Sequence, residues 1–344
     1  MSKRKPSKMR VMITGATGFV GYHTALELLQ AGHDVSLLVR SERKMTALFG
    51  AGRIKHFTCG DVTDMDSVRA ALRGCDAVIH SAAMVSTAAS DQDAVFRTNV
   101  LGTRNVIGAA LEADIQRVIH VSSVTALYDR TAKVLDANSP PGTGNNTYGR
   151  SKVASEKYVR KLQSKGAPIY VTYPATVIGP DDPGLTDAHA GLQMFLKTAV
   201  TLLPSGNQYV DVRDIAIVHR RLLEERPAFG RYLLGGHFLS WWQLAKKLEM
   251  LTGRRLPKVP VLGLPARLAG RLFDKLAPVL PLEVPLTEEA MGYATQWVRM
   301  DNSSVEKMLD FSFRPVDDSL RDSIAWMARA GHLSARQAGK LGQG

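Results

Sequence analysis

Tyr148 and Lys152 stand four residues apart in the segment TYGRSK (147–152), so a helix there would carry both on one face. A tyrosine hydroxyl exchanges a proton with a substrate oxygen near neutral pH only if its pKa is lowered. A lysine ammonium one helical turn away lowers that pKa, because it stabilises the phenolate. Ser123, in HVSSVTALY (120–128), offers a hydroxyl that would orient the same oxygen. Tyrosine and lysine at this spacing also occur by chance, so the interpretation depends on what surrounds them.

Three glycines lie in TGATGFVG (14–21), between a short apolar run and a helical pattern. The lack of a Cβ atom at Gly15, Gly18 and Gly21 would let the backbone approach a pyrophosphate at the start of the following helix. The spacing Gly-x-x-Gly-x-x-Gly differs from the Gly-x-Gly-x-x-Gly of many dehydrogenases. In a first strand–turn–helix unit this pattern predicts a dinucleotide-binding loop.

The end of the second predicted strand selects between the two nicotinamide coenzymes. A carboxylate there would bind the ribose 2′-hydroxyl of NAD, whereas an arginine favours the 2′-phosphate of NADP. The chain has Arg40 at this point, with Arg43 and Lys44 one turn on, so NADP(H) is expected and NAD(H) is the second choice. After the third strand, Asp61 and Val62 in CGDVTD (59–64) would lie near the adenine, although Asp61 could equally be a helix cap.

Alternating strand and helix patterns in the first half must position these groups. Six apolar, β-branched runs read as strands covered on both faces, which is typical of a parallel sheet. The runs are RVMIT (10–14), DVSLLV (34–39), IKHFT (54–58), DAVIH (76–80), RVIHV (117–121) and IYVTY (169–173). The predicted fold is α/β, a Rossmann-type doubly wound parallel sheet with a smaller, mostly helical C-terminal substrate lobe.

The predicted domain boundaries follow from where this alternation stops. We expect a disordered basic tail over 1–8, a dinucleotide-binding Rossmann domain over 9–180 and a substrate lobe over 181–330. Within that lobe, 205–235 is expected to return to the sheet. A flexible tail is expected over 331–344.

Charge and cysteine content restrict the class of protein. Of the net charge of +12, eight units lie in the first ten and last sixteen residues. The sequence shows no zinc-finger, helix-turn-helix or ribonucleoprotein pattern, so nucleic-acid binding is not expected. Cys59 and Cys75 have no metal-ligand spacing, and no metal is expected. The two cysteines make no disulfide framework, so a reducing cytoplasm is the simplest expected location. No apolar stretch is long enough to cross a bilayer.

Taken together, the motifs resemble those of the extended short-chain dehydrogenase/reductase family, within the NAD-dependent epimerase/dehydratase superfamily. The similarity covers roughly residues 9–235 in the family's order and spacing. It rests on TGATGFVG, GDVTD, HSAA, NVLGTRNVIGAA, HVSS, YGRSK, PATVIGP and VDVRD. The segments PATVIGPDD and VRSERK are most similar to those of the dihydroflavonol-reductase and 3β-hydroxysteroid-dehydrogenase-like branch.

The resemblance implies roles for individual residues. Ser123 would be the catalytic serine, Tyr148 the acid/base and Lys152 the residue that lowers its pKa, while Ser122 would be structural. Asn99 would support the site or pack inside its helix. The coenzyme-binding residues implied by the resemblance are Gly15, Thr17, Gly18, Phe19, Val20 and Gly21 in the first loop, Ala82 and Ala83 after the fourth strand, and Pro174 and Val177 after the sixth.

Three departures from the family pattern bear on the expected reaction and substrate. The segment SSVTA (122–126) lacks the acidic pair that sugar dehydratases carry, which disfavours dehydration. Tyr173 stands where many sugar-nucleotide members have arginine, which weakens a nucleotide-sugar substrate. Asp129 follows Tyr128 where many epimerases have glycine.

The predicted substrate lobe is largely apolar. Leu192, Met194, Phe195 and Leu196 would form an apolar surface for the substrate. His189 could reach a substrate, but a lone histidine in such a loop is more simply expected in solvent. Trp241 and Trp242, at a helix start, are expected in the core. The segment LPARLAGRLFDKLAPVLP (264–281) is basic on one face and apolar on the other. Such a helix can lie on a membrane surface, cap the substrate lobe or pair with a second subunit.

These observations lead to one hypothesis and two alternatives. The chain is predicted to be an NADP(H)-dependent oxidoreductase that interconverts a carbonyl and a secondary alcohol on a largely apolar small molecule. One alternative is an epimerase of the same family, which would keep NAD tightly bound. The other is a non-catalytic dinucleotide-binding sensor or scaffold. A homodimer is an expectation carried only by the resemblance, and peripheral membrane contact is not favoured.

Overall fold

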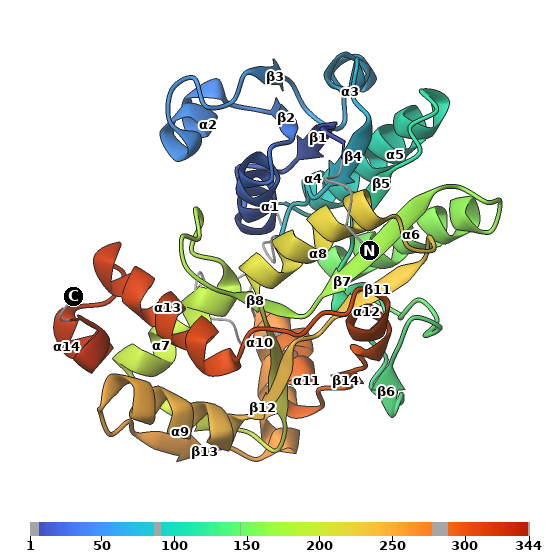
Figure 1. Ribbon diagram of the computed structural model, residues 1–344. Coiled ribbons are helices and arrows are strands. Elements are labelled where there is room, and N and C mark those ends of the chain that lie inside the picture. The colour runs from blue at the N-terminus through green and yellow to red at the C-terminus, as the bar shows by residue number, and fades with distance from the viewer. Residues whose placement is uncertain (1–6, 86–90, 145, 277–287, 343–344) are drawn as a thin grey trace.

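A seven-stranded parallel sheet forms the centre of the protein, in a computed structural model that describes residues 7–85, 91–144, 146–276 and 288–342 (Figure 1). The strand order is β11-β7-β5-β4-β1-β2-β3. The strands are β1 (Arg10–Thr14), β2 (Asp34–Val39), β3 (His56–Cys59), β4 (Ala77–His80), β5 (Val118–Val121), β7 (Ile169–Pro174) and β11 (Arg231–Leu234). The order reverses direction between β1 and β4, so the loops after these two strands leave toward opposite faces and open a crevice. The predicted doubly wound α/β fold is confirmed.

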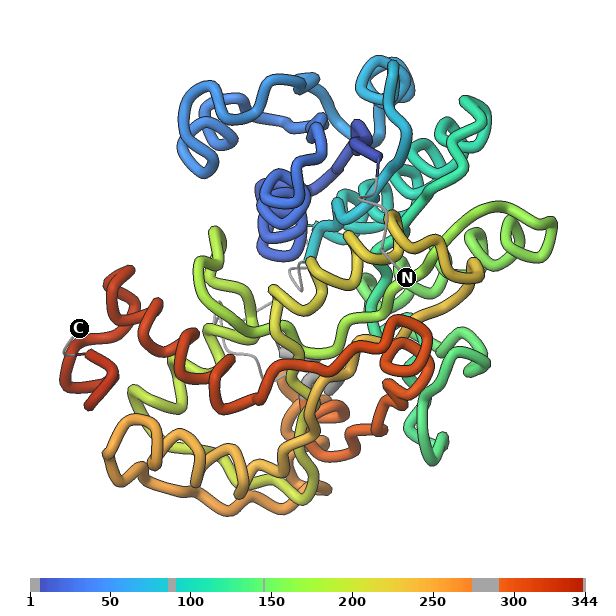
Figure 2. The backbone as a smooth tube through the Cα atoms, viewed as in Figure 1, coloured from blue at the N-terminus to red at the C-terminus, as the bar shows by residue number. Residues whose placement is uncertain are grey.

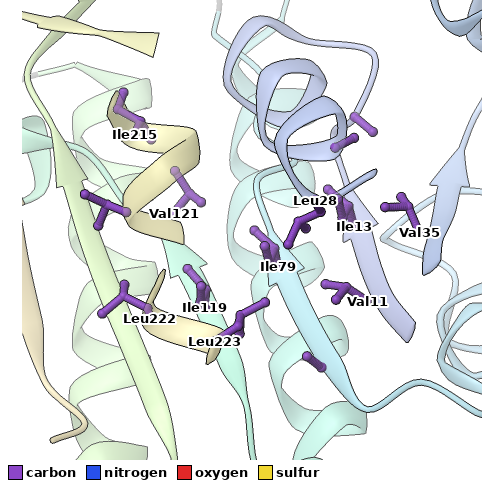
Figure 3. Close-up of a cluster of buried hydrophobic side chains, with 14 of the residues drawn as sticks. Val11, Ile13, Leu28, Val35, Ile79, Ile119, Val121, Ile215, Leu222 and Leu223 are labelled. Atoms are coloured by element: carbon purple, nitrogen blue, oxygen red, sulfur yellow. The ribbon is translucent and has the colours of Figure 1, made fainter. Parts of the chain in front are cut away.

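Alternate side chains of each strand enter two different cores, because successive residues of a strand point to opposite faces. Val11 and Ile13 of β1 belong to one buried core with Leu28 of α1 (Phe19–Gln30) and Leu222 of α8 (Val212–Glu225), and Figure 3 shows Leu28 beside Ile13. Met12, between them, packs on the other face. The helices of that face are α3 (Met65–Leu72), α5 (Gly102–Glu112) and α6 (Thr147–Gln163). Burial on both faces explains why the inner strands read as continuous apolar runs, whereas the edge strand β3 is only partly buried.

Two short helical segments link the sheet to α5. They are α4 (Gln92–Phe96) and a π-helical turn, η2 (Arg97–Leu101). The second helix of the chain, α2 (Glu42–Phe49), follows β2 and buries Met45 and Phe49 in the first core.

The C-terminal lobe has its own sheet and core. β8 (Thr176–Ile178), β10 (Gly206–Asp211) and β12 (His237–Ser240) form a three-stranded sheet. Its core is closed by α7 (Asp187–Lys197), α9 (Trp241–Thr252) and α13 (Val316–Arg329). The remaining elements are β6 (Val134–Leu135), β9 (Val200–Leu202), β13 (Lys258–Pro260), α10 (Gly263–Leu276), α11 (Glu288–Thr295), β14 (Arg299–Met300), α12 (Ser303–Met308) and α14 (Ala335–Ala338).

The segment 205–235 returns to the large sheet only at its end. β11 pairs with β7, as expected, but β10 pairs with β8 and β12 instead. Between them, α8 lies beside α1 over the large sheet. The polypeptide therefore crosses between the two sheets within one strand–helix–strand unit, as the tube in Figure 2 shows.

The two chain ends differ from the expected tails in their described parts. Ser334 caps α14 through a capping box with Gln337, Ala338 is buried, and Arg254 Nη1 donates to the Gln337 carbonyl. The expectation of a flexible segment over 331–344 is therefore wrong up to residue 342, because apolar contacts and a capped helix hold it against the lobe. At the other end Lys8 forms an ion pair with Asp34 at 2.9 Å, while residues 1–6 of the predicted tail lie outside the described residues.

Candidate active site

The glycine loop lies in the crevice between β1 and β4. Gly15 has φ +74°, and a Cβ atom there would lie 2.6 Å from the Ala82 amide nitrogen. A Cβ atom on Gly21 would lie 2.3 Å from the Gly15 carbonyl oxygen. Gly18 donates to that same carbonyl at 3.0 Å and begins α1. Glycine is thus required at Gly15 and Gly21 by the fold itself.

The start of α1 has the properties of an anion site. Among the described residues none caps this helix with a side chain, and its first turn, FVGY, contains no acidic group. Its amide groups and the positive end of its dipole suit a pyrophosphate. Thr17 and Val20 are half-buried, and Phe19 is buried with its ring centre 5.3 Å from that of His23. The residues present fit a dinucleotide.

Buried polar contacts join the loops that follow β1 and β4. The Thr14 hydroxyl accepts a hydrogen bond from the Ala82 amide at 3.2 Å and lies 2.8 Å from His80 Nδ1. Ala82 is half-buried and Ala83 is exposed. These bonds fix the separation of the two walls of the crevice.

The basic residues expected at the adenosine end lie together after β2. Arg40 follows the strand, Ser41 caps α2 by accepting from the Lys44 amide at 3.2 Å, and Arg43 lies in the same first turn. All three cationic side chains are exposed, and none of them forms an ion pair within the described part of the chain. They are therefore available to an anion.

Asp61 does not cap a helix. Its carboxylate accepts from the Thr63 amide and hydroxyl, both at 2.8 Å, and the cap of α3 is Asp64. The turn inserts three residues between Asp61 and the helix, which explains why the cap falls one turn later. Val62 is buried, and its carbonyl accepts from Asn105.

The three predicted catalytic side chains come from β5 and α6. Ser123 follows β5 and begins a short 3-10 turn, η3 (Val124–Ala126), which packs against α6. Asn146 caps α6 by accepting from the Gly149 amide at 2.7 Å, so Tyr148 lies in its first turn. The Lys152 ammonium nitrogen lies 5.8 Å from the centre of the Tyr148 ring. The structure thus brings the tyrosine and lysine together beside the serine loop.

Lys152 is buried, and this determines its protonation. Burial lowers the pKa of Lys152 from 10.5 to about 8, while the Glu156 carboxylate acts in the opposite direction. Behind it, the His80 and His120 rings stack with centroids 5.6 Å apart. Burial, and next the neighbouring positive charges, hold the pKa of both imidazoles well below the usual value. Both rings are therefore neutral at pH 7.

Glu156, one turn after Lys152, anchors a buried polar network that the sequence motifs did not identify. Its carboxylate accepts from the Tyr173 hydroxyl at 2.5 Å, from Arg160 Nε at 2.6 Å and from the Ser122 hydroxyl at 3.4 Å. Burial and the Glu156 charge raise the pKa of Tyr173, so it remains a neutral donor. The regular spacing of four residues from Tyr148 to Arg160 was the available signal.

Asn99 lies in η2 and connects the β4 loop to α6. Its amide oxygen accepts from the Met84 amide at 2.8 Å, and its amide nitrogen donates to the Met84 carbonyl at 3.0 Å and to the Ser151 hydroxyl at 2.9 Å. Ser151 in turn donates to the Tyr148 carbonyl at 2.7 Å. Asn99 therefore positions the helix that carries the tyrosine and lysine. π-Helical turns are frequent at functional sites.

The last two predicted coenzyme contacts lie on separate strands. Pro174 ends β7 and pairs with Leu234 of β11, whereas Val177 belongs to β8 and pairs with Val210. The carboxyl end of β7 is at the same edge of the sheet as those of β1, β4 and β5.

The predicted apolar substrate surface on α7 is largely wrong. Leu192, Phe195 and Leu196 are buried in the core of the lobe, and only Met194 is exposed. His189 is fully buried and bonds Asp182 at 2.8 Å, so the expectation that it lies in solvent is also wrong.

The expectation for the two tryptophans is right for one of them. Trp241 is buried and Trp242 is exposed, because the side chains of consecutive helical residues point about 100° apart.

An aromatic cluster joins the serine loop to the lobe. Tyr128, five residues after Ser123, packs on Tyr293 with ring centres 4.3 Å apart, and Tyr293 lies 6.2 Å from Trp297. The Tyr128 hydroxyl donates to the Gln296 carbonyl at 2.8 Å. The cluster depends on contacts across 165 residues of sequence, which no local pattern indicates.

The described residues contain neither a candidate metal site nor a helix that could cross a membrane. They contain no cluster of three or more histidine, cysteine, aspartate or glutamate side chains that could hold a metal ion. No helix in the same part of the chain has the length and apolar character to cross a membrane.

Comparisons with known proteins agree with the fold described above. The model of the NAD dependent epimerase/dehydratase family matches residues 11–235. A protein of Synechocystis sp. named for dihydroflavonol 4-reductase is 29% identical over 94% of this chain and 96% of its own. Cinnamoyl-CoA reductase 1 of Petunia hybrida is 32% identical over 96% of this chain and 95% of its own. The crystal structure of gox2253 superposes with a TM-score of 0.78 at 27% identity, covering 95% and 100% of the two chains.

Proposed function

The chain belongs to the NAD-dependent epimerase/dehydratase family and is an NAD(P)-dependent oxidoreductase, and from this premise we propose that it interconverts a carbonyl and a secondary alcohol on an apolar small molecule with NADP(H). The observation that carries the proposal is the buried Lys152 ammonium beside Tyr148, on a helix that packs against the serine loop. The glycine loop and the start of α1 would hold the pyrophosphate, and Lys152 would hold the nicotinamide ribose.

The chain's own residues would handle the proton and the substrate oxygen. A bound nicotinamide supplies or accepts the hydride. During reduction, the Tyr148 hydroxyl gives its proton to the oxygen that becomes an alcohol, and the Lys152 ammonium stabilises the phenolate left behind. The Ser123 hydroxyl donates a hydrogen bond to the same oxygen. In the reverse direction the Tyr148 phenolate takes the proton back.

The preference for NADP(H) follows from the charge at the end of β2. Arg40, Arg43 and Lys44 are exposed and close in sequence, and they would surround the 2′-phosphate. Arg40→Glu should weaken NADPH binding at least tenfold and leave NADH binding almost unchanged, as measured by fluorescence titration. Arg53→Glu, at an exposed position in the next loop, is the matched charge control. Tighter binding of NADH by the unmodified protein would refute the preference.

Three features support an apolar substrate. Tyr173 occupies the position of a sugar-nucleotide arginine and is committed to Glu156 inside the core. The aromatic cluster of Tyr128, Tyr293 and Trp297 lies where the serine loop meets the lobe. Dihydroflavonol 4-reductase and cinnamoyl-CoA reductase are named for substrates with aromatic rings.

The decisive experiment is turnover of hydrophobic ketones with NADPH by the unmodified protein and by Tyr148→Phe. The variant should lose at least a thousandfold in kcat and still bind NADPH, because only the proton donor is removed. Tyr158→Phe, on the same helix, is the control. Unchanged turnover by Tyr148→Phe would refute the mechanism. A purified protein that retains NAD through gel filtration would instead favour the epimerase alternative.

A further inference from the structure

Helix α10 presents a stripe of leucines to solvent. Leu264, Leu268 and Leu272 follow one another at four-residue intervals and are 62%, 52% and 59% exposed. Leu262, just before the helix, is 76% exposed. Ala266 and Gly270, on the opposite side of the helix, are buried. A continuous exposed apolar stripe of this kind marks an interaction surface.

The opposite side of α10 is fixed against the protein. Arg267 Nη1 donates to the Thr295 hydroxyl at 3.0 Å, and α11 packs along the helix. The orientation that exposes the leucines is therefore imposed by contacts with the lobe, so the stripe is a stable surface feature.

A tryptophan that contacts two lysines precedes this stripe in the chain, and one of the two, Lys258, lies just before Leu262. The exposed Trp242 ring has the Lys246 ammonium 5.4 Å and the Lys258 ammonium 5.8 Å from its centre. Val259, which follows Lys258 in β13, is 49% exposed, and Leu262 comes three residues later. Tryptophan beside lysine is typical of the boundary between hydrocarbon and polar headgroups.

The charge of this region is strongly one-sided. Residues 241–273 contain seven basic residues and one acidic residue, Glu249, which is paired with Lys258 at 2.6 Å. Half of the net charge of the chain thus lies in this tenth of its length. A second copy of the chain would bring like charge against like charge, whereas an acidic lipid surface would complement it.

We propose that Leu262, Leu264, Leu268, Leu272 and Trp242, here called the leucine face, dock this protein on the surface of an anionic phospholipid membrane. The leucines enter the boundary between headgroups and acyl chains, and α10 lies in the plane of the membrane. The exposed basic side chains of this region, Lys246 and Arg255 among them, bind the lipid phosphates.

Vesicle flotation tests the proposal with the full chain. The protein should float with vesicles of phosphatidylcholine mixed with phosphatidylglycerol, remain at the bottom with phosphatidylcholine alone, and be released by salt. Leu268→Ser with Leu272→Ser should reduce the bound fraction at least about tenfold. Lys246→Ala should reduce it about fivefold.

Two controls keep the result specific. Phe57→Ser with Phe229→Ser removes two other exposed apolar side chains and should leave flotation unchanged. Each variant should retain the unfolding midpoint and NADPH binding of the unmodified protein. Failure of the unmodified protein to float, equal binding to both kinds of vesicle, or full flotation by the leucine variant would each overturn the proposal. A dimer without vesicle binding that the leucine variant dissociates would assign the face to a second copy instead.

Discussion

Replacing Gly21 with alanine tests whether the fold itself requires the glycine loop. Gly21 lies in the first turn of α1, where alanine would ordinarily stabilise the helix. Its added Cβ atom would lie 2.3 Å from the Gly15 carbonyl oxygen and 2.7 Å from the carbonyl carbon, both of which belong to the backbone. The loop must therefore move away, together with the carbonyl that holds the Gly18 amide.

The size of the effect follows from two opposing terms. Alanine for glycine inside a helix stabilises by about 0.5–1 kcal/mol, whereas overpacking costs about 1–3 kcal/mol. The contact is with backbone atoms, so the overpacking cost is about 2–3 kcal/mol, and with a helix gain of about 1 kcal/mol the net loss at Gly21 is about 1–2 kcal/mol. An unfolding entropy of about 2.1 cal/mol/K per residue over 344 residues gives about 0.7 kcal/mol/K, so Tm should fall by roughly 1.5–3 °C.

Gly191 provides the matched control, because it lies inside α7 and its added Cβ atom would meet nothing within 4 Å. Gly191→Ala should raise Tm by about 1 °C. Thermal unfolding and NADPH titration of both variants make the comparison. Gly21→Ala should also bind NADPH at least about tenfold more weakly, because the loop is displaced. An increase in Tm at Gly21 equal to that at Gly191, with unchanged NADPH affinity, would refute the reasoning.

Two further predictions concern buried charges. Glu156→Gln removes the carboxylate that opposes the effect of burial on Lys152, so the pKa of Lys152 should fall below about 8. The alkaline limb of the kcat/KM profile should move to lower pH, Glu156→Asp should restore part of the shift, and an unmoved limb would contradict the assigned role. Burial, and next the Asp211 charge, raise the pKa of Asp214 from 3.8 to about 6. The contribution of Asp214 to the free energy of unfolding is therefore fully present below pH 3.8 and is lost as the pH rises through 6. In urea titrations, Asp214→Asn should therefore raise the free energy of unfolding at pH 8 by about 2–3 kcal/mol, at about 1.4 kcal/mol per pKa unit. The same substitution should change the free energy of unfolding little at pH 4. Equal effects at both pH values would argue against the assignment.

Local patterns predicted the parts of the molecule that depend on neighbouring residues. The strands of the large sheet were recognisable because both faces are buried, and the glycine loop because a close backbone approach tolerates few other residues. The cap of α6 and the spacing of Tyr148 and Lys152 are likewise contained in a few consecutive residues.

Features built from distant segments were not predictable in this way. The apolar residues of α7 could line a pocket or fill a core, and only the packing of α9 and α13 decides for the core. Asp61 and Asp64 are equally good caps by residue type, and the turn at Thr63 selects the second. The last described residues form a helix because Arg254 and the lobe provide partners that the tail itself does not contain.

The stacked histidines behind Lys152 have a consequence for the electric field in the crevice. Both ring nitrogens of His120 lack a hydrogen-bond partner among the described residues, and both rings are fully enclosed. Because both rings are neutral and shut off from water, they supply no net charge and no solvent to screen the neighbouring ammonium. The field of the single ammonium is therefore directed outward, toward Tyr148 and the open edge of the sheet. The neutral rings of His80 and His120 thus form a low-dielectric layer behind Lys152. The ammonium therefore acts most strongly on the side of Tyr148, where the proton moves.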